Sequence, residues 1–188
     1  SGDLTHLPLL RNLGKRGKPV ILSTGMANLS ETEAAVEAVR STGNQRVAVL
    51  HCVSDYPADP STCNLNVMST LRAAFGTPVG WSDHTTGDAI SVAAVAMGAQ
   101  LLEKHFTLDC EMAGPDHRAS LEPKAFIELV EKVRSVESAL GDGFKVPTLA
   151  ERATAQVARR SLVLDRALPA GHKLQAGDVI VLRPGTGI

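Results

Sequence analysis

Short apolar runs alternate with longer segments of helical periodicity along most of the chain. The runs predict four strands, at residues 20–24, 47–52, 78–82 and 101–106; the first is rich in β-branched residues and the second is almost wholly apolar. A segment with helix signals follows each run, between residues 30 and 43, 66 and 75, 86 and 98, and 123 and 140. Strands that are apolar on both faces and alternate with helices are typical of a parallel sheet covered by helices, so the pattern predicts an α/β fold.

Local signals mark where the predicted helices begin and end. Ser30 and Glu33 have the spacing of a capping box, which predicts Ser30 as the N-cap of the first helix. Pro123 suits the first turn of the last helix, and Gly141 suits the position just past its end.

Four strand–helix units are compatible with an open doubly wound sheet or with half of a (β/α)₈ barrel. A full barrel takes about 250 residues. Half a barrel alone would leave two bare parallel edges, which soluble proteins avoid. Because the chain also begins at Ser1 rather than at a methionine, we expect either an open sheet or a piece of a longer protein that lacks the first half of its barrel here.

The amino-acid composition of the sequence changes after Gly141. Residues 142–160 are polar with few large apolar side chains, which is typical of a linker that is partly helical. Two short apolar runs at 161–164 and 179–182 flank turn signals and predict a small β-rich module. We therefore expect a first domain over residues 1–141, a linker over 142–160 and the beginning of a second domain over 161–188.

Composition excludes several functional classes. The chain of 188 residues is 44% hydrophobic and 21% charged, values that are ordinary for a folded protein. Its 19 basic and 20 acidic residues leave a net charge of −1, so neither nucleic acid nor an anionic membrane surface is an expected partner. The most apolar stretch is too short and too polar to span a membrane. Three cysteines cannot all pair, which favours a reducing, cytoplasmic location.

Polar residues gather where the predicted strands end, although the strand bodies are apolar. In parallel α/β folds, functional groups collect at the carboxyl ends of the strands. Side chains two apart on a strand share a face, so Ser82 lies with His84, and Glu103 with His105. Cys52 and its neighbour His51 point to opposite faces for the same reason, so they are not expected to form a catalytic dyad.

His84 and His105 end neighbouring predicted strands, and two interpretations of them remain open on the residues alone. Two imidazoles can share one divalent cation with open positions for water or substrate oxygens, which suits a Lewis-acid metal such as Mn²⁺. Two hydrogen-bonded structural histidines would produce the same pattern. Ser23 and the Gly25 backbone amide could likewise hold phosphate oxygens or simply form a turn.

Five motifs in order resemble those of the sialic acid synthase family. They are GKPVILSTGM at 17–26, HCVSDYP at 51–57, GWSDHT at 80–85, EKHFTLD at 103–109 and GPDH at 114–117. The resemblance covers essentially the whole chain and implies the second half of a (β/α)₈ TIM barrel followed by the start of a small antifreeze-like (SAF) domain. It therefore also implies that the chain is a fragment of a longer synthase and is inactive alone.

The resemblance assigns roles to particular residues. It implies that His84 and His105 bind a divalent metal, Mn²⁺ or Mg²⁺, and that Glu103 and Asp116 bind the hydroxyls of an amino sugar. The other matching positions hold substrate, with Arg183 reaching into the neighbouring subunit of a domain-swapped homodimer; they are Ser1, Ser23, Ser54, Tyr56, Ser82 and Arg183. Ser54 departs from the family, since some members carry asparagine there.

The reaction implied by the resemblance is a metal-dependent condensation of phosphoenolpyruvate with an N-acetylated amino sugar, giving a sialic-acid-type nonulosonate and phosphate. The sugar remains open between N-acetylmannosamine and the precursors of legionaminate or pseudaminate. The run His117–Ser120 resembles the sialic and legionaminic branches more than the pseudaminic one. A non-catalytic sugar-binding fragment is the alternative from another functional class.

Overall fold

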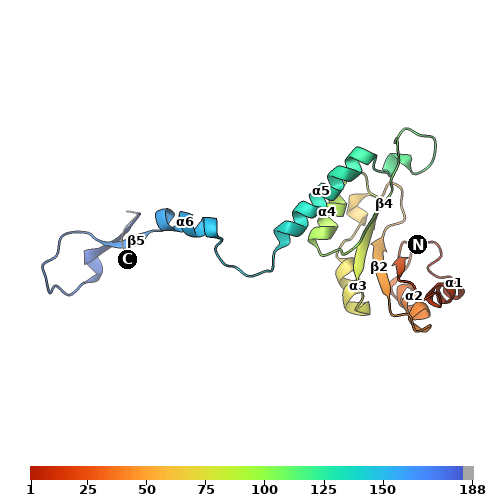
Figure 1. Ribbon diagram of the computed structural model, residues 1–188, viewed down its shortest axis with the longest axis horizontal. Coiled ribbons are helices and arrows are strands. Elements are labelled where there is room, and N and C mark those ends of the chain that lie inside the picture. Colours follow the sequence, from red (N-terminus) through yellow and green to blue (C-terminus); the bar gives the residue numbers. More distant parts are fainter. Residues whose placement is uncertain (184–188) are drawn as a thin grey trace. The chain divides into compact units, whose positions relative to one another are not determined.

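A four-stranded, wholly parallel sheet is the centre of the first 141 residues in the computed structural model (Figure 1). Its strands are β1 (Val20–Ser23), β2 (Val47–Cys52), β3 (Val79–Asp83) and β4 (Leu102–Lys104). They lie side by side in chain order, β1-β2-β3-β4. A doubly wound sheet reverses its strand order at a switch point, whereas a barrel adds each strand beside the last. The half-barrel is therefore confirmed and the open doubly wound sheet is excluded.

The structure describes residues 1–183 and divides the chain into two compact units, Ser1–Gly141 and Asp142–Ile188. Helices follow the strands of the first unit and pack on them, with α2 against β1 and β2, α3 against β2 and β3, and α4 against β3. The helices of this unit are α1 (Leu7–Gly14), α2 (Leu29–Arg40), α3 (Val67–Phe75), α4 (Ala89–Ala96) and α5 (Pro123–Leu140), with short 3₁₀ turns η1 (Pro60–Thr62) and η2 (His117–Ala119).

The start of one helix and the presence of another differ from the sequence prediction. The capping box of α2 uses Asn28 and Glu31 rather than Ser30 and Glu33. The Asn28 side chain accepts from the Glu31 amide at 2.9 Å, and the Glu31 carboxylate accepts from the Asn28 amide at 2.8 Å. Asn28 has extended backbone angles, so the chain turns into the helix two residues earlier than expected. Helix α1, which the sequence pattern did not predict, has a proline in its first turn.

The apolar core of this unit lies between the sheet and its helices. Val49 of β2 and Trp81 of β3 are fully buried, and Val36 and Val39 of α2 pack in the same cluster. The Trp81 ring lies 5.1 Å from the His51 ring, measured between centroids. Trp81 directly precedes Ser82, so the core and the polar strand end share one rigid strand.

Gly80 has no room for a side chain. A Cβ atom there would lie 2.3 Å from the Leu101 carbonyl oxygen and 2.7 Å from a Leu50 methyl carbon. We expect Gly80→Ala to force β3 and β4 apart and to destabilise the domain by about 1–3 kcal/mol, the usual cost of overpacking. Thermal unfolding of the full-length protein measures this, with Gly2→Ala as the control because nothing lies within 4 Å of a Cβ at Gly2. Equal melting temperatures for the two variants would contradict the expectation.

A buried ion pair joins the ends of β3 and β4. Lys104 Nζ lies 3.1 Å from Asp83 Oδ2, with side chains that are 1% and 0% exposed. The remaining capacity of the Asp83 carboxylate is used by the amide and hydroxyl of Thr85, both at 2.8 Å, and by the hydroxyl of Ser91 on α4. Lys104 also donates to the Thr85 carbonyl. These bonds hold the residues on either side of His84 and the residue just before His105.

The second unit contains a helix and a two-stranded antiparallel sheet. Helix α6 (Leu149–Ala158) falls within the predicted linker, and strands β5 (Ser161–Leu164) and β6 (Val179–Leu182) occupy the predicted residues, with the 3₁₀ turn η3 (Ala176–Asp178) before β6. Asp178, which is 3% exposed, accepts from Arg166 at 2.6 Å and from His172 at 2.7 Å. This cluster pins the long connection between the two strands.

Among the helices that the structure describes, none has the length and apolar character of a membrane span.

Candidate functional site

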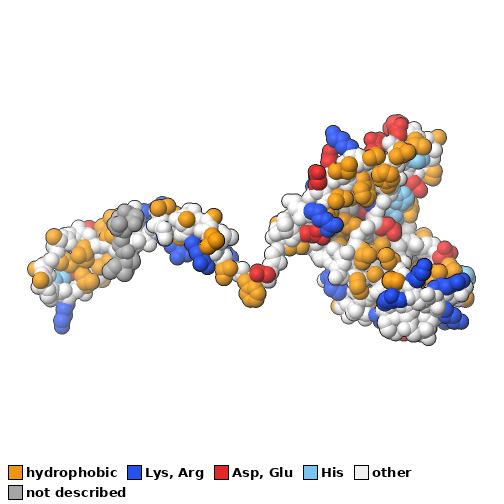
Figure 2. All heavy atoms as spheres, in the orientation of Figure 1, with side chains coloured by type: hydrophobic (Ala, Val, Ile, Leu, Met, Phe, Trp, Pro, Cys, Tyr) orange, Lys and Arg blue, Asp and Glu red, His pale blue; other side chains and the backbone are white. Residues whose placement is uncertain are grey.

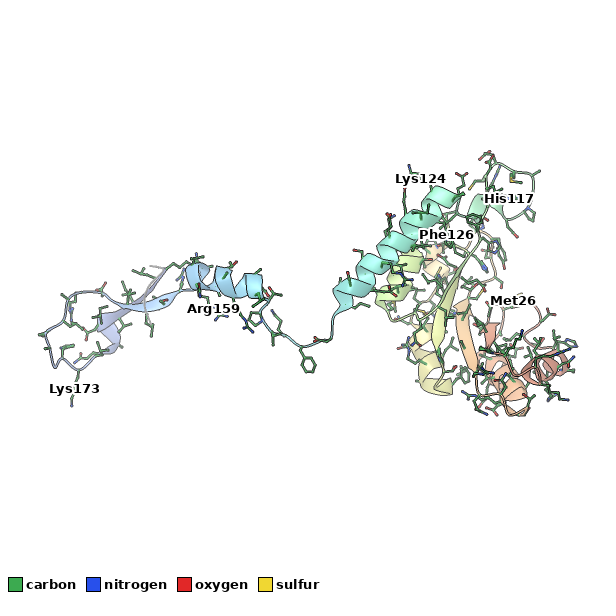
Figure 3. The ribbon with its side chains drawn as sticks, in the orientation of Figure 1. Met26, His117, Lys124, Phe126, Arg159 and Lys173 are labelled. Carbon is green, nitrogen blue, oxygen red and sulfur yellow. The ribbon has the colours of Figure 1, made fainter. Side chains whose placement is uncertain are left out.

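An open pocket of about 530 Å³ lies at the carboxyl ends of the four strands of the first unit. It brings together every predicted site residue of this unit except Asp116, which stands beside it. Its lining consists of Ser1, Gly2, Ile21, Ser23, Met26, Ser54, Tyr56, Ser82, His84, Glu103 and His105. Met26 stands just after β1 (Figure 3), and Figure 2 shows histidine and acidic side chains adjoining on the surface of this unit.

Hydroxyl groups and a backbone amide converge on the β1 side of the pocket. Ser1 Oγ lies 3.1 Å from Ser23 Oγ and accepts from the Gly25 amide at 3.1 Å. Ser54 Oγ is buried there, without a hydrogen-bond partner among the described residues. A Cβ atom at Gly25 would lie 2.0 Å from Ser54 Oγ, so only glycine allows these groups to meet. Clustered donors of this kind suit the oxygens of an anion.

His84 and His105 come from the ends of neighbouring strands and lie with ring centroids 5.2 Å apart. His84 Nδ1 lies 2.7 Å from the Val53 carbonyl oxygen. A carbonyl only accepts, so Nδ1 carries a hydrogen and Nε2 is the nitrogen left for a ligand. Metal-binding histidines are typically oriented by such a bond.

The two imidazoles fit a divalent metal ion. Nitrogens that share an ion at about 2.0–2.1 Å lie within about 4.2 Å of one another, which rings 5.2 Å apart can reach. No larger group of His, Cys, Asp and Glu in the described part of the chain could hold a metal by itself. The pair is therefore an open donor set, in which oxygens from water or substrate would complete the coordination.

Carboxylates and an aromatic ring surround the histidines. Asp116 Oδ2 lies 4.0 Å from His105 Nδ1, and Ser82 Oγ donates to Glu103 Oε1 at 2.7 Å. The Tyr56 ring lies 4.2 Å from the His84 ring and 5.5 Å from the His105 ring. Burial, followed by the nearby charge of Cys52, raises the pKa of Tyr56 above its ordinary value. The Tyr56 hydroxyl therefore stays protonated and uncharged where it lines the pocket.

Cys52 contacts two residues of the pocket lining, Ser1 and His84, although the sequence analysis gave it no role in the site. Its sulfur lies 3.6 Å from Ser1 Oγ and 3.8 Å from His84 Nδ1. Burial alone would raise the pKa of the Cys52 thiol, but hydrogen bonds with His84, Ser23 and Ser1 outweigh burial and lower this pKa to about 6. Burial alone would lower the pKa of His84, but the bonds to Cys52 and to the Val53 carbonyl outweigh it and raise this pKa.

His51 lies outside the site, as the alternation along β2 predicted. Its Nε2 donates to the Cys63 carbonyl at 2.8 Å. Burial lowers the pKa of His51 below its ordinary value of 6.5, and hydrogen bonds to backbone carbonyls offset only part of this effect.

This shift makes stability depend on pH. Below pH 6.5 the unfolded chain takes up a proton at His51 that the folded domain resists, so stability is lost as the pH falls from 6.5 toward the folded pKa. We expect His51→Gln to remove this contribution. Urea unfolding of the full-length protein between about pH 5 and about pH 8 measures the slope. An identical slope in the parent and the variant would contradict the assignment.

The remaining predicted site residue, Arg183, belongs to the second unit, where it follows β6 and is exposed. Pro184 and Gly185, which complete the Arg-Pro-Gly motif, lie outside the described residues, as does the rest of the predicted second domain to residue 188.

Comparisons with known proteins identify the class of protein that carries this fold and pocket. Residues 1–145 match the NeuB family. N,N'-diacetyllegionaminic acid synthase of Campylobacter jejuni is 44% identical over 100% of this chain and 57% of its own length. Mouse N-acetylneuraminate-9-phosphate synthase is 40% identical over 98% of this chain and 51% of its own length.

A solved structure gives the same answer for the fold. The N-acetylneuraminic acid synthetase of Leptospira borgpetersenii matches with a TM-score of 0.75 and 36% identity, over 82% of this chain and 54% of that one. The chain belongs to the NeuB family. It spans about half the length of the curated relatives that it matches.

Proposed function

We propose that the full-length protein containing this chain condenses phosphoenolpyruvate with an N-acetylated amino sugar to give a sialic-acid-type nonulosonate and phosphate. A carbon–carbon bond forms between the alkene carbon of the enol phosphate and the sugar's aldehyde carbon. Water adds at the neighbouring carbon, and phosphate leaves by C–O cleavage. The juxtaposition in one pocket of a hydroxyl–amide cluster and an open histidine pair carries this proposal, because the reaction needs an anion site beside a carbonyl site.

The residues on the β1 side would bind and orient phosphoenolpyruvate. Ser1 and Ser23 offer hydroxyls 3.1 Å apart, and the buried hydroxyl of Ser54 has bonding capacity to spare. Holding the enol phosphate here brings its alkene carbon close to the histidine side of the pocket. Positioning of two reactants can supply a large part of a rate enhancement.

His84 and His105 would hold the divalent metal, Mn²⁺ or Mg²⁺, and when bound this ion would supply Lewis acidity to the sugar's carbonyl oxygen. Glu103, oriented by Ser82, and Asp116, beside His105, would accept hydrogen bonds from the sugar hydroxyls. Either carboxylate could hold a proton at an oxygen atom during the reaction. Tyr56 packs on both histidine rings and limits the access of water from that side.

We further propose that residues 161–188 begin an antifreeze-like domain after a linker at 142–160, and that Arg183 reaches the partner's pocket in a domain-swapped cytoplasmic homodimer. The resemblance in sequence and the exposure of Arg183 support this. We expect Arg183→Ala to raise KM for the amino sugar about tenfold or more, because a lost bond to a polar group costs 1–3 kcal/mol, and to leave KM for phosphoenolpyruvate unchanged. Steady-state kinetics with each substrate varied checks this, and a monomer in sedimentation would refute the swap.

Removing and restoring the metal tests the proposed reaction. Full-length protein is treated with a chelator, assayed for phosphate release with phosphoenolpyruvate and an amino sugar, and assayed again after Mn²⁺ is added. We expect release to require both the metal and the sugar. Comparing N-acetylmannosamine with the diacetylated bacterial sugar identifies the substrate. Undiminished release without metal would reject the Lewis-acid role, and sugar binding without any phosphate release would favour a non-catalytic protein.

A further inference from the structure

We propose that Cys52 is a positioning residue that joins the two halves of the pocket, fixing the hydroxyl of Ser1 relative to the imidazole of His84. The inference rests on the proposed function for its catalytic meaning, but its structural content stands on contacts of this chain. Cys52 ends β2, the strand between the one that carries Ser23 and the one that carries Ser82. Its side chain is 5% exposed, so its sulfur stays where the strand puts it.

The first contact of the sulfur is with the anion side of the pocket. Ser1 Oγ already accepts from the Gly25 amide at 3.1 Å, which leaves the single hydroxyl hydrogen of Ser1 to be directed. The candidate acceptors are Ser23 Oγ at 3.1 Å and Cys52 Sγ at 3.6 Å. With either acceptor the hydrogen of Ser1 is used within the protein, so Ser23 is the serine left to donate to a substrate oxygen. The sulfur offers the Ser1 hydroxyl an acceptor other than Ser23 and so influences the direction in which that hydroxyl points.

The second contact of the sulfur is with His84. The Nδ1 hydrogen points to the Val53 carbonyl at 2.7 Å, and Cys52 Sγ lies 3.8 Å from the same nitrogen. A carbonyl and a sulfur therefore flank Nδ1 and limit rotation of the ring, which holds Nε2 in one direction. Groups that orient a ligand in this way typically change metal affinity or activity 10–100-fold when they are lost.

The register of the sheet explains why one side chain reaches both groups. Cys52 pairs with Ser82 across β2 and β3, and His84 lies two residues beyond Ser82 on the same face. Ser23 pairs with Leu50 across β1 and β2, two residues before Cys52. Along the sheet, position 52 is therefore level with a point two residues beyond Ser23 on one side and two residues before His84 on the other. A larger residue would displace Ser1, and alanine would reach neither group.

Three variants of the full-length protein test the proposal: Cys52→Ala, Cys52→Ser and, as a matched control, Cys63→Ala. Cys63 is also buried, at 1% exposure, but its sulfur contacts the Asp59 carbonyl and not the pocket. We expect Cys52→Ala to weaken phosphoenolpyruvate binding to the metal-free protein about tenfold in calorimetry. We expect Cys52→Ser to recover part of the loss, and Cys63→Ala to match the parent in binding.

A spectroscopic readout is independent of turnover. Long-range proton–nitrogen correlation of the imidazoles, assigned through a His84→Gln sample, should show a shifted Nδ1 signal for His84 in Cys52→Ala but not in Cys63→Ala. Titration with Mn²⁺ alone should give a weaker affinity in Cys52→Ala. If Cys52→Ala and Cys63→Ala lose only melting temperature and agree in binding and in spectra, Cys52 is a packing residue and the proposal is wrong.

The outcomes also separate this proposal from the proposed function. If the parent protein releases phosphate but Cys52→Ala behaves as Cys63→Ala, the positioning role fails and the reaction stands. If the parent protein releases no phosphate with any amino sugar, the reaction fails, while the His84 spectra and Mn²⁺ affinities still decide whether Cys52 orients the ring.

Discussion

Replacing His84 with alanine is expected to reduce turnover by the full-length protein by roughly 10³-fold, because a bound Lewis acid supplies several kcal/mol of transition-state stabilisation. The variant would lose one of two rings whose centroids lie 5.2 Å apart, so only His105 would remain of the proposed histidine pair. The measurements are the rate of phosphate release at saturating phosphoenolpyruvate and the affinity for Mn²⁺ by calorimetry.

The matched control for this prediction is His51→Gln. His51 is also a buried histidine in a neighbouring strand, but it donates to the Cys63 carbonyl instead of facing the pocket. It should lose stability and keep its Mn²⁺ affinity. In the proposed site both histidines serve one ion, so His105→Ala and the double variant should lose about as much activity as His84→Ala alone. Unchanged Mn²⁺ affinity in His84→Ala would show that the two rings are structural.

Lys104→Met is expected to destabilise the domain by about 3–5 kcal/mol, the cost of leaving a buried charge without its partner. The Asp83 carboxylate would keep its bonds to Thr85 and Ser91 but lose the ammonium 3.1 Å away, in a place closed to water. Methionine retains the apolar volume of the lysine stem, so the loss would report the charge and not a cavity. Denaturant unfolding of the full-length protein measures the change.

A second substitution makes this expectation specific. Asp83→Asn in the Lys104→Met background removes the unpaired charge and keeps an oxygen for the Thr85 amide. The double variant should therefore be more stable than Lys104→Met alone, which a double-mutant cycle would quantify. Should both variants prove equally unstable, the lysine would be stabilising the domain through packing rather than through charge.

Local signals determined the elements that the sequence predicted well. Strand β2 and helix α5 have the expected bounds because an almost wholly apolar run marks the strand, and Pro123 and Gly141 mark the two ends of the helix. The start of α2 was misplaced because Asn28 and Ser30 are both good caps, and only the backbone path decides between them. Helix α1 was missed because a sequence of eight residues carries little periodic signal.

The site was predictable as far as residues share a strand or match a family motif. Alternation placed Ser82 with His84 and Glu103 with His105, and all four line one pocket. The contact between Cys52 and His84 depends on how β2 and β3 are aligned with one another. The alternation of residues along a single strand carries no information on that alignment. The same limit applies to the ion pair of Lys104, whose partner Asp83 lies on the neighbouring strand β3.

The fully buried indole of Trp81 can serve as an intrinsic fluorescence probe of this domain. It is the single tryptophan of the chain, so emission from these residues arises at one place. Its neighbours along β3 are Gly80, whose lack of a side chain lets β4 approach, and Ser82, which enters the pocket. The His51 ring beside it titrates and can quench fluorescence when protonated. If β3 loosened and water reached Trp81, its emission maximum would shift to the red. Protonation of His51 on acidification would lower the emission intensity.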